Sequence, residues 1–412
     1  KIADPINLMK GNELPVSSII ENGMVDGSFQ HGTAHYEKRG IADEVPEWQP
    51  DMCIQCNQCA YVCPHAVIRP FLLDEEEMKK APEGMPTIKA LGRGMDGLEY
   101  KIQVSPLDCT GCSACVDVCP APRGKAIVMK STQSQIERNE IEYTDYLFNN
   151  VSYKDKILGK NTVKGSQFAK PLFEFSGACA GCGETPYIKL VTQLFGERMI
   201  VANATGCSSI YGASAPSSPY TTAESGCGPA WASSLFEDNA EYGYGMFQAV
   251  NTIRLRILKR MEEIKADVSN ELADLFTIFA ENFHDGDKTT EIRDELVILL
   301  EKENNENPNE KVKKNTQEIL ELKQYLIKKS MWMFGGDGWA YDIGFGGLDH
   351  VLASGDDVNV LVLDTEVYSN TGGQSSKSSR AGAVAKFAAS GKPVKKKDLA
   401  AILMTYGNIY VA

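Results

Sequence analysis

Cysteine is the residue type whose spacing says most about the chemistry of this chain. Eight of its twelve cysteines form two runs of the pattern C-x2-C-x2-C-x3-C-P. Three thiolates at this spacing can hold one face of a cubane 4Fe-4S cluster, while the fourth, one helical turn further on, reaches the neighbouring cluster. The spacing therefore predicts one cluster on Cys53, Cys56, Cys59 and Cys119, and a second on Cys109, Cys112, Cys115 and Cys63.

Zinc is the alternative metal for these thiolates. A zinc site needs four ligands in CxxC-type pairs and has no use for two interleaved runs of four cysteines. The observed pattern is that of bacterial ferredoxins. We therefore expect residues 51–130 to form an α+β two-cluster ferredoxin-like domain.

A glycine-rich turn later in the chain carries a second kind of chemistry. The apolar run 331–334 has the character of a buried parallel strand, and it breaks at Gly335, Gly336, Asp337 and Gly338. Glycines let the backbone approach a bound group, and N–H groups at the start of a following helix would face a diphosphate. A carboxylate beside such an anion implies a cation between them, and Mg2+ fits.

A second apolar run, residues 358–363, leads into a polar loop that contains Thr365, Val367 and Asn370. Ligands in open parallel sheets bind beyond the carboxyl ends of the strands. We therefore expect an α/β fold with a mostly parallel sheet and helices on both faces, and a binding site at these loops.

The GDG sequence, followed by a strand and an asparagine, resembles the thiamine diphosphate motif of thiamine-dependent enzymes. The particular forms GDGWAYDIGFGGLDHVLA and DTEVYSNTGGQ look like those of the pyruvate:ferredoxin oxidoreductases. The resemblance implies that Asp337, Thr365 and the backbone carbonyl of Val367 hold Mg2+. It also implies that Gly336 and Gly338 bind the cofactor, and that Asn370 faces the diphosphate and the reacting carbon as a catalytic residue.

A third 4Fe-4S site is implied by the same resemblance at Cys179, Cys182 and Cys207, next to the thiamine cofactor. The family takes the fourth ligand from beyond the thiamine motif, but no cysteine follows Cys227 in this chain. Either that ligand lies in a missing C-terminal piece, which we favour, or Cys227 replaces it. Cys182 and Glu184 are further expected neighbours of the thiamine cofactor.

Composition along the chain suggests four parts. Residues 1–50 lack periodicity and are expected to connect to a missing N-terminal region, and residues 131–165 are polar and read as an irregular tether. Residues 166–412 should form the thiamine diphosphate and Mg2+ domain, with the third cluster and a helical insertion at 246–330. The chain starts without methionine and ends within an apolar stretch, so we expect a piece of a longer protein, truncated at its C-terminus.

The resemblance implies an enzyme that converts pyruvate and coenzyme A to acetyl-CoA and CO2. Electrons would pass from the thiamine cofactor through three 4Fe-4S clusters to ferredoxin or flavodoxin, in anaerobic metabolism and in a homodimer. Because the family's substrate-binding residues are absent here, a related 2-oxo acid oxidoreductase stays open, and the fragment alone should be inactive. A non-catalytic polyferredoxin is the alternative from another class, but it gives the glycine-rich loops no purpose.

Composition excludes some other classes. The net charge of −13 argues against a nucleic acid partner. No apolar run reaches the roughly eighteen residues of a membrane span. Twelve cysteines without an export signal favour metal binding in a reducing cytoplasm over disulfides.

Overall fold

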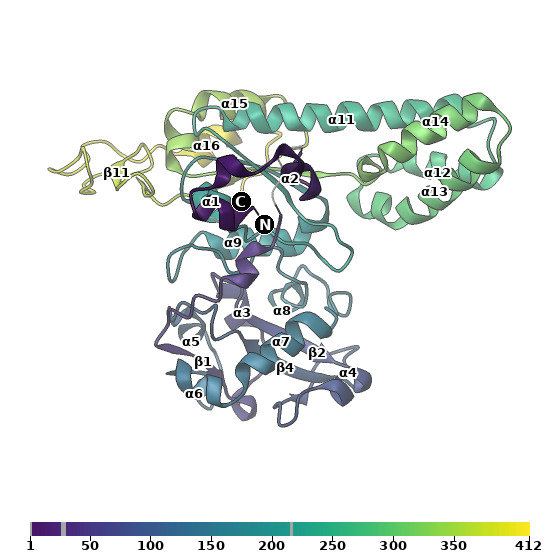
Figure 1. Ribbon diagram of the computed structural model, residues 1–412. Helices are drawn as coiled ribbons and strands as arrows, with labels where there is room; N and C mark the ends of the chain where they lie inside the picture. The colour runs from purple at the N-terminus through teal and green to yellow at the C-terminus, as the bar shows by residue number, and fades with distance from the viewer. Residues whose placement is uncertain (1, 26–29, 215–216) are drawn as a thin grey trace.

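The computed structural model of the chain describes residues 2–25, 30–214 and 217–412. Residues 1 and 26–29 of the predicted connector and 215–216 of the predicted thiamine domain lie outside the described part. Figure 1 shows a lower body with the cysteine runs, an upper body built on a parallel sheet, and a helical projection beside the upper body. None of the helices in the described residues has the length and apolarity needed to cross a bilayer.

The lower body repeats one small unit twice. In each unit a cysteine loop leads into a short helix, α3 (Gln58–Val62) or α5 (Ala114–Asp117). Two antiparallel sheets pack with these helices around one core. The first pairs β1 (Glu44–Trp48) with β5 (Ile127–Ser131), and the second has the order β2 (Ile68–Leu73), β4 (Glu99–Val104), β3 (Ile88–Lys89). This is the α+β architecture expected from the cysteine spacing, although its first strand begins at Glu44, before residue 51.

The expectation of an irregular tether at 131–165 is wrong. The segment holds α6 (Thr132–Glu137), α7 (Glu140–Asn150) and α8 (Val163–Ser166). Tyr143 and Leu147 of α7 are buried against Phe71 of β2 in a small core of the lower body. The buried face of α7 carries few apolar residues, so its helical period was too weak to recognise in the sequence.

Residues 1–50 also hold more structure than a connector. Helices α1 (Ala3–Asn7), η1 (Gly11–Glu13), α2 (Val16–Glu21) and η2 (Thr33–Tyr36) precede β1. Gly32 and Ala34 donate backbone hydrogen bonds to Tyr220 O and Ser218 O at 2.6 and 3.1 Å. The segment thus runs along the upper body before its last strand joins the lower one. Neither η1 nor α2 buries a residue, which explains the missing apolar pattern.

Four parallel strands in the order β7, β6, β8, β9 form the sheet of the upper body. The central strands β6 (Met199–Ala204) and β8 (Ser330–Gly335) are almost completely buried, which is why they read as continuous apolar runs. The outer strands are β7 (Ala230–Ser234) and β9 (Asn359–Val362). Two apolar clusters pack against the sheet, with side chains from α9 (Thr185–Phe195), α15 (Phe345–Ala353) and α16 (Leu399–Met404).

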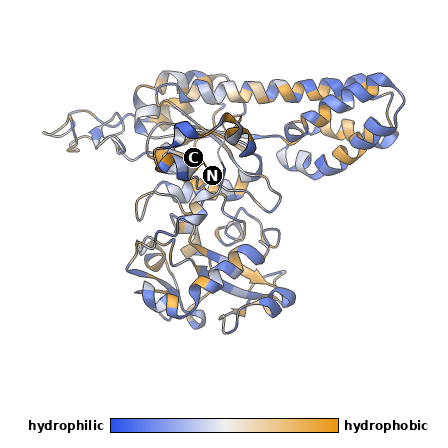
Figure 2. Cartoon of the chain, viewed as in Figure 1, coloured by the Kyte–Doolittle hydropathy of each residue, from blue (hydrophilic) through white to orange (hydrophobic). Residues whose placement is uncertain are grey.

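The helical projection begins earlier than the predicted insertion at residue 246. The long helix α11 (Asn239–Ile264) leaves the upper body and carries α12 (Asn270–Glu281), α13 (Gly286–Glu306) and α14 (Glu310–Glu321) at its far end (Figure 1). Figure 2 shows hydrophobic and hydrophilic residues alternating along α11, as in an amphipathic helix. The four helices bury a core of their own, which includes Leu272, Phe279 and Leu300.

A buried ion pair joins the lower body to the upper one. Arg69 of β2 is 3% exposed and pairs with the carboxylate of Glu174, which is 5% exposed. Arg69 also donates to the Tyr153 hydroxyl at 2.9 Å, and its guanidinium carbon lies 4.2 Å from the ring centre of Phe148 and 5.2 Å from that of Phe175. Polar and aromatic partners thus surround the cation and offset its desolvation.

Replacing Arg69 should weaken this junction strongly. Arg69→Met leaves the Glu174 carboxylate buried without its partner, which costs about 3–5 kcal/mol. Anaerobic urea titrations followed by circular dichroism should show this loss of unfolding free energy. Lys79→Met is the control, because Lys79 pairs with Glu75 and Glu76 in solvent and should matter little. Equal effects of the two substitutions would mean that the buried pair does not hold the bodies together.

Candidate functional site

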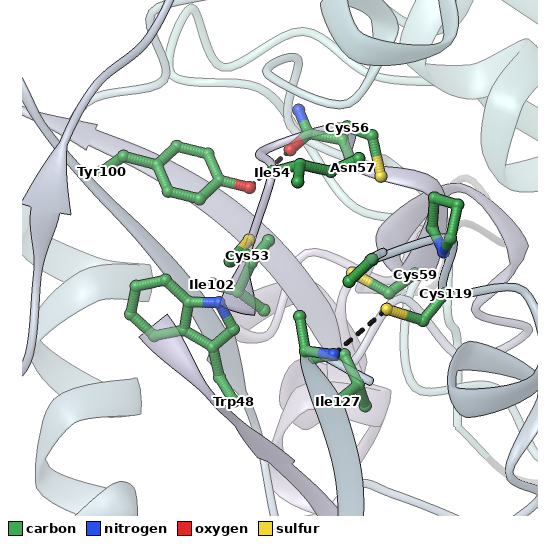
Figure 3. Close-up of a pocket in the computed structure, with 13 residues that line it drawn as sticks. Trp48, Cys53, Ile54, Cys56, Asn57, Cys59, Tyr100, Ile102, Cys119 and Ile127 are labelled. Atoms are coloured by element: carbon green, nitrogen blue, oxygen red, sulfur yellow. Dashed lines mark hydrogen bonds between the residues drawn. The ribbon is translucent and has the colours of Figure 1, made fainter. Parts of the chain in front are cut away.

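The structure brings the four cysteines of the first predicted cluster into one hollow (Figure 3). Cys53, Cys56 and Cys59 come from the first loop, and Cys119 arrives from just beyond α5. The other walls are mainly apolar and aromatic side chains from β1, β4 and β5, Trp48 among them. About 330 Å3 between them is free of protein atoms.

Two buried amide side chains hold the first cysteine loop in shape. Gln55 and Asn57 have positive φ values of 56° and 61° and are each 1% exposed. Gln55 Nε2 donates to Lys89 O at 2.7 Å, and Leu91 N donates to Gln55 Oε1 at 2.8 Å. The Tyr100 hydroxyl donates to Asn57 Oδ1 at 2.6 Å (Figure 3). These bonds offset the cost of the left-handed backbone at both residues.

A second hollow, with about 320 Å3 free of protein atoms, lies beside the second cysteine loop. The second cysteine loop repeats the backbone conformation of the first: Gly111 and Ser113, at the places of Gln55 and Asn57, have positive φ values of 69° and 63°. The predicted exchange of the fourth cysteine between the runs is seen here too. The hollow is lined by Cys63, Cys109, Cys112 and Cys115.

Backbone amides donate to sulfur in both hollows. Gln55 N lies 3.4 Å from Cys53 Sγ, and Gly111 N lies 3.4 Å from Cys109 Sγ. Such donors favour the thiolate form. Burial acts in the opposite direction: it raises the pKa of Cys109 to about 12, and it raises the pKa of Cys59 well above its usual range. A thiolate in these hollows therefore needs a cationic partner, which iron would supply.

The origin of the four cysteines suits a pair of clusters better than two zinc ions, because each hollow takes three cysteines from one run and the fourth from the other. A mononuclear zinc site binds its sulfurs at about 2.3 Å and needs no such exchange between runs. A cubane spreads its four thiolates around four irons. Each four-cysteine hollow therefore fits a 4Fe-4S cluster.

A larger pocket, with about 670 Å3 free of protein atoms, lies at the carboxyl ends of β6, β8 and β9. It collects every predicted thiamine or magnesium residue except Cys182, which instead packs in the adjoining core. The predicted residues that line it are Glu184, Gly336, Asp337, Gly338, Thr365, Val367 and Asn370.

The three predicted magnesium donors lie together in this pocket. Thr365 N donates to Asp337 Oδ1 at 3.0 Å, and the Thr365 hydroxyl donates to Val367 O at 3.1 Å. An octahedral Mg2+ with ligands at 2.0–2.1 Å holds neighbouring oxygens about 3 Å apart. The Thr365 hydroxyl and the Val367 carbonyl have this oxygen spacing, and the Asp337 carboxylate is bonded to the backbone of Thr365 beside them, so the three groups form a donor set that fits Mg2+.

Asp337 has the environment of a carboxylate that needs a cation. It is 3% exposed, and burial raises its pKa to about 6, despite the hydrogen bond from Thr365 N. The charge of Asp364 acts in the same direction as burial. The turn after Asp337 is a π-helix, η7 (Gly338–Asp342), where the sequence predicted an ordinary helix start. A Cβ at Gly338 would collide with the Tyr368 ring, so this tight turn needs glycine.

The three cysteines of the predicted third cluster lie beside the same pocket. Cys207 follows β6, starts α10 (Cys207–Ser209) and lines the pocket with Asp337. Burial is the largest of the causes that raise the pKa of Cys207 to about 11, and the charges of Glu184, Cys182 and Cys179 act in the same direction.

Cys227 is not brought to this group. It precedes β7, whereas Cys207 follows β6, the parallel neighbour of β7. These are opposite ends of parallel strands, and a strand of this length spans roughly 17–20 Å. The geometry gives no support to Cys227 as the fourth ligand.

Three residues near these sites were not predicted from the sequence. Trp48 lines the first hollow, Tyr211 donates to Glu184 Oε2 at 2.8 Å, and Ser376 donates to Asp337 Oδ2 at 3.1 Å. Ser376 closely follows the SNTGGQ sequence, and that proximity was a usable signal. Trp48 and Tyr211 reach their sites only through long-range packing, for which the sequence carries no local sign.

Three family descriptions match parts of the chain. Residues 52–123 match a 4Fe-4S dicluster domain, and residues 321–412 match the C-terminal TPP binding domain of thiamine pyrophosphate enzymes. Residues 1–42 match EKR, a domain of unknown function. The predicted ferredoxin-like domain and the predicted thiamine-binding α/β domain are thereby confirmed.

Named relatives match the whole chain. Pyruvate:ferredoxin oxidoreductase of Moorella thermoacetica is 55% identical over 421 residues, covering 100% of this chain and 35% of that protein. Pyruvate-flavodoxin oxidoreductase of Klebsiella pneumoniae is 55% identical, covering 100% of this chain and 34% of that protein. The mitochondrial NADP+ pyruvate dehydrogenase of Euglena gracilis is 48% identical, covering 100% of this chain and 22% of that protein. The chain thus spans about a third of the first two relatives, and the resemblance seen in the sequence is confirmed.

The crossed arrangement of cysteines can be tested by removing Cys119. Cys119→Ala should remove about four irons per chain. The lost cluster should be the one that Cys53→Ala also removes, although the two residues belong to different runs. Iron analysis measures the loss, and anaerobic EPR of the reduced protein shows which cluster is missing. Cys227→Ala is the control and should keep all iron. A Cys119→Ala spectrum that matched Cys109→Ala would contradict the assignment.

The magnesium donors can be tested at Asp337. Asp337→Asn should weaken the binding of Mg2+ with thiamine diphosphate by at least roughly tenfold, because even outer partners of metal ligands have effects of this size. Titration calorimetry on the anaerobic protein measures it. Asp349→Asn is the matched control, since Asp349 lies on α15, accepts a hydrogen bond from the Tyr406 hydroxyl at 2.8 Å and does not line the pocket. Similar losses in both variants would count against Asp337 as a ligand.

Proposed function

We propose that the chain is the cluster-carrying, thiamine-binding part of a pyruvate:ferredoxin or pyruvate:flavodoxin oxidoreductase. The reaction converts pyruvate and coenzyme A to acetyl-CoA and CO2, and electrons pass through three 4Fe-4S clusters. One observation carries the proposal: Cys207, a ligand of the proposed third cluster, lines the same pocket as Asp337. A redox centre bordering a thiamine pocket suits an enzyme that removes electrons one at a time.

The pocket residues have distinct roles in this proposal. Asp337, Thr365 and the Val367 carbonyl would hold Mg2+, and the glycines around Asp337 would let the backbone approach the diphosphate. Asn370 lines the same pocket, where its side-chain amide would face the diphosphate and the reacting carbon. Thiamine diphosphate, when bound, supplies the carbanion chemistry that breaks the bond between the carboxylate and the 2-oxo carbon. Glu184 stands in the same pocket, held by Tyr211, and burial raises the pKa of this carboxyl.

Contacts between the two bodies support a route for the electrons. His65, which lines the second hollow, donates from Nε2 to Ala178 O at 3.0 Å, one residue before Cys179. A Cβ on Gly181 would lie 3.5 Å from the Cβ of Cys112. The third site thus touches the second hollow, and in this proposal the first hollow is the last station of the route. Electrons would leave near the first hollow, where Ile54 is 48% exposed.

The partners follow from the relatives and the residues together. The relatives' names support pyruvate as substrate and ferredoxin or flavodoxin as acceptor. The Euglena name contains NADP+, so the final acceptor depends on parts outside this chain. We also propose coenzyme A as co-substrate, a homodimer, and a cytoplasmic setting that keeps the cluster thiols reduced. A pure electron carrier would leave the Asp337 pocket unexplained.

The proposal is tested on the intact protein that contains this chain, purified anaerobically. We expect about twelve irons per chain, bound thiamine diphosphate, and clusters that become EPR-active after pyruvate and coenzyme A are added. 2-Oxoglutarate in place of pyruvate is the substrate control and should reduce them far less. About eight irons without thiamine would refute the third cluster and catalysis together, and would leave an electron carrier.

A further inference from the structure

A buried lysine from the upper body reaches into the iron-sulfur module. Lys189 lies on α9 and is 1% exposed. Its ammonium donates to the carbonyls of Ala60, Tyr61 and Cys63, the last two at 2.9 and 3.2 Å. Three carbonyl acceptors around one nitrogen require three N–H donors, and only the protonated lysine has them. A full positive charge therefore sits against the backbone of Cys63.

The second cysteine run also has a lysine bound to its last carbonyls, but this lysine comes from the iron-sulfur module itself. Lys125 donates to Asp117 O and Cys119 O, both at 3.0 Å. Asp117 and Cys119 hold the same places in the second run as Tyr61 and Cys63 in the first. Each cysteine run thus ends with its last carbonyls bound to an ammonium. Lys125 belongs to the module and is exposed to solvent, whereas Lys189 belongs to the thiamine-binding domain and is buried.

We propose that Lys189 raises the reduction potential of the cluster held by Cys63, Cys109, Cys112 and Cys115, and that docking of the thiamine-binding domain thereby sets this potential. The inference rests on the proposed function for the identity of the cluster. Each cluster takes up one electron on reduction and becomes one unit more negative, so a nearby fixed positive charge favours the reduced form.

Burial decides how strong each lysine's effect is. The interaction of two charges grows as the effective dielectric constant falls, and exposed charges are screened by water and salt. Lys189 is 1% exposed, so water and salt screen its charge little from the cysteine loop whose carbonyls it binds. The exposed Lys125 should influence the cluster at Cys119 much less.

The contact between the two bodies would also favour electron transfer out of the pocket of Asp337. The third site touches the second hollow through the contacts of His65 and Gly181. A higher potential at that hollow would draw electrons away from the pocket of Asp337. An iron-sulfur module without the upper body would lack Lys189, and the potential of its second cluster should be correspondingly lower.

The test is an EPR redox titration of the anaerobic holoprotein with dithionite. Lys189→Gln keeps a hydrogen-bond donor but removes the charge. We expect it to lower the ratio of reduced to oxidised second cluster roughly tenfold at a fixed potential, which corresponds to 59 mV for a one-electron couple. Two controls should change the ratio of reduced to oxidised cluster by less than about threefold. Lys189→Arg keeps the charge and is measured at the second cluster. Lys125→Gln is the matched surface change and is measured at the first cluster, which Cys119 helps to hold. The second-cluster signal is the one that Cys109→Ala removes.

Each other result would overturn the inference. An unchanged potential in Lys189→Gln would mean that the charge does not act on the cluster. A loss of iron in Lys189→Gln would assign the lysine to assembly of the module instead. A Lys125→Gln shift as large as that of Lys189→Gln would remove the role of burial. Dithionite replaces pyruvate as reductant, so a failure of catalysis leaves this measurement intact, and the two proposals fail separately.

Discussion

The pairing of Arg69 with Glu174 is the interaction on which the remaining geometry depends. A buried ion pair costs desolvation energy and gives little net stability unless its partners are well placed. Here Tyr153, Phe148 and Phe175 supply those partners. We expect the pair to hold the cysteine module and the sheet in one relative position. The short contacts of His65 with Ala178 and of Gly181 with Cys112 exist only in that position.

The parallel sheet provides the second constraint. Because β6, β8 and β9 run in one direction, the residues that follow them all emerge at one edge. Cys207, Asp337 and Thr365 are far apart in the chain, yet each follows one of these strands and all three line one pocket. The redox site and the cofactor site therefore share a wall as a consequence of topology. No special loop is needed to bring them together.

Structure could be predicted from the sequence where a local residue pattern, such as an apolar run or a cysteine spacing, has a single physical explanation. The strands β8 and β9 were predictable because their continuous apolar runs end at glycine-rich or polar loops, and the crossed cysteine sets followed from spacing alone. Helix α7 was missed because it buries too few apolar side chains to show a period. The role of Lys189 left no trace in the sequence, since a lysine on an amphipathic helix ordinarily faces water. Its burial results from the docking of two bodies, which no local pattern encodes.

The helical projection has a consequence for how the chain reaches its fold. Strands β7 and β8 flank a long excursion, and pairing β8 with β6 requires the chain to close that loop at an entropic cost. The helices α11 to α14 make mostly local contacts around their own core, and such units form quickly. Once folded, these helices bring the two ends of the excursion back to the sheet, so the entropic cost of pairing β8 with β6 is lower than for a flexible loop of the same length.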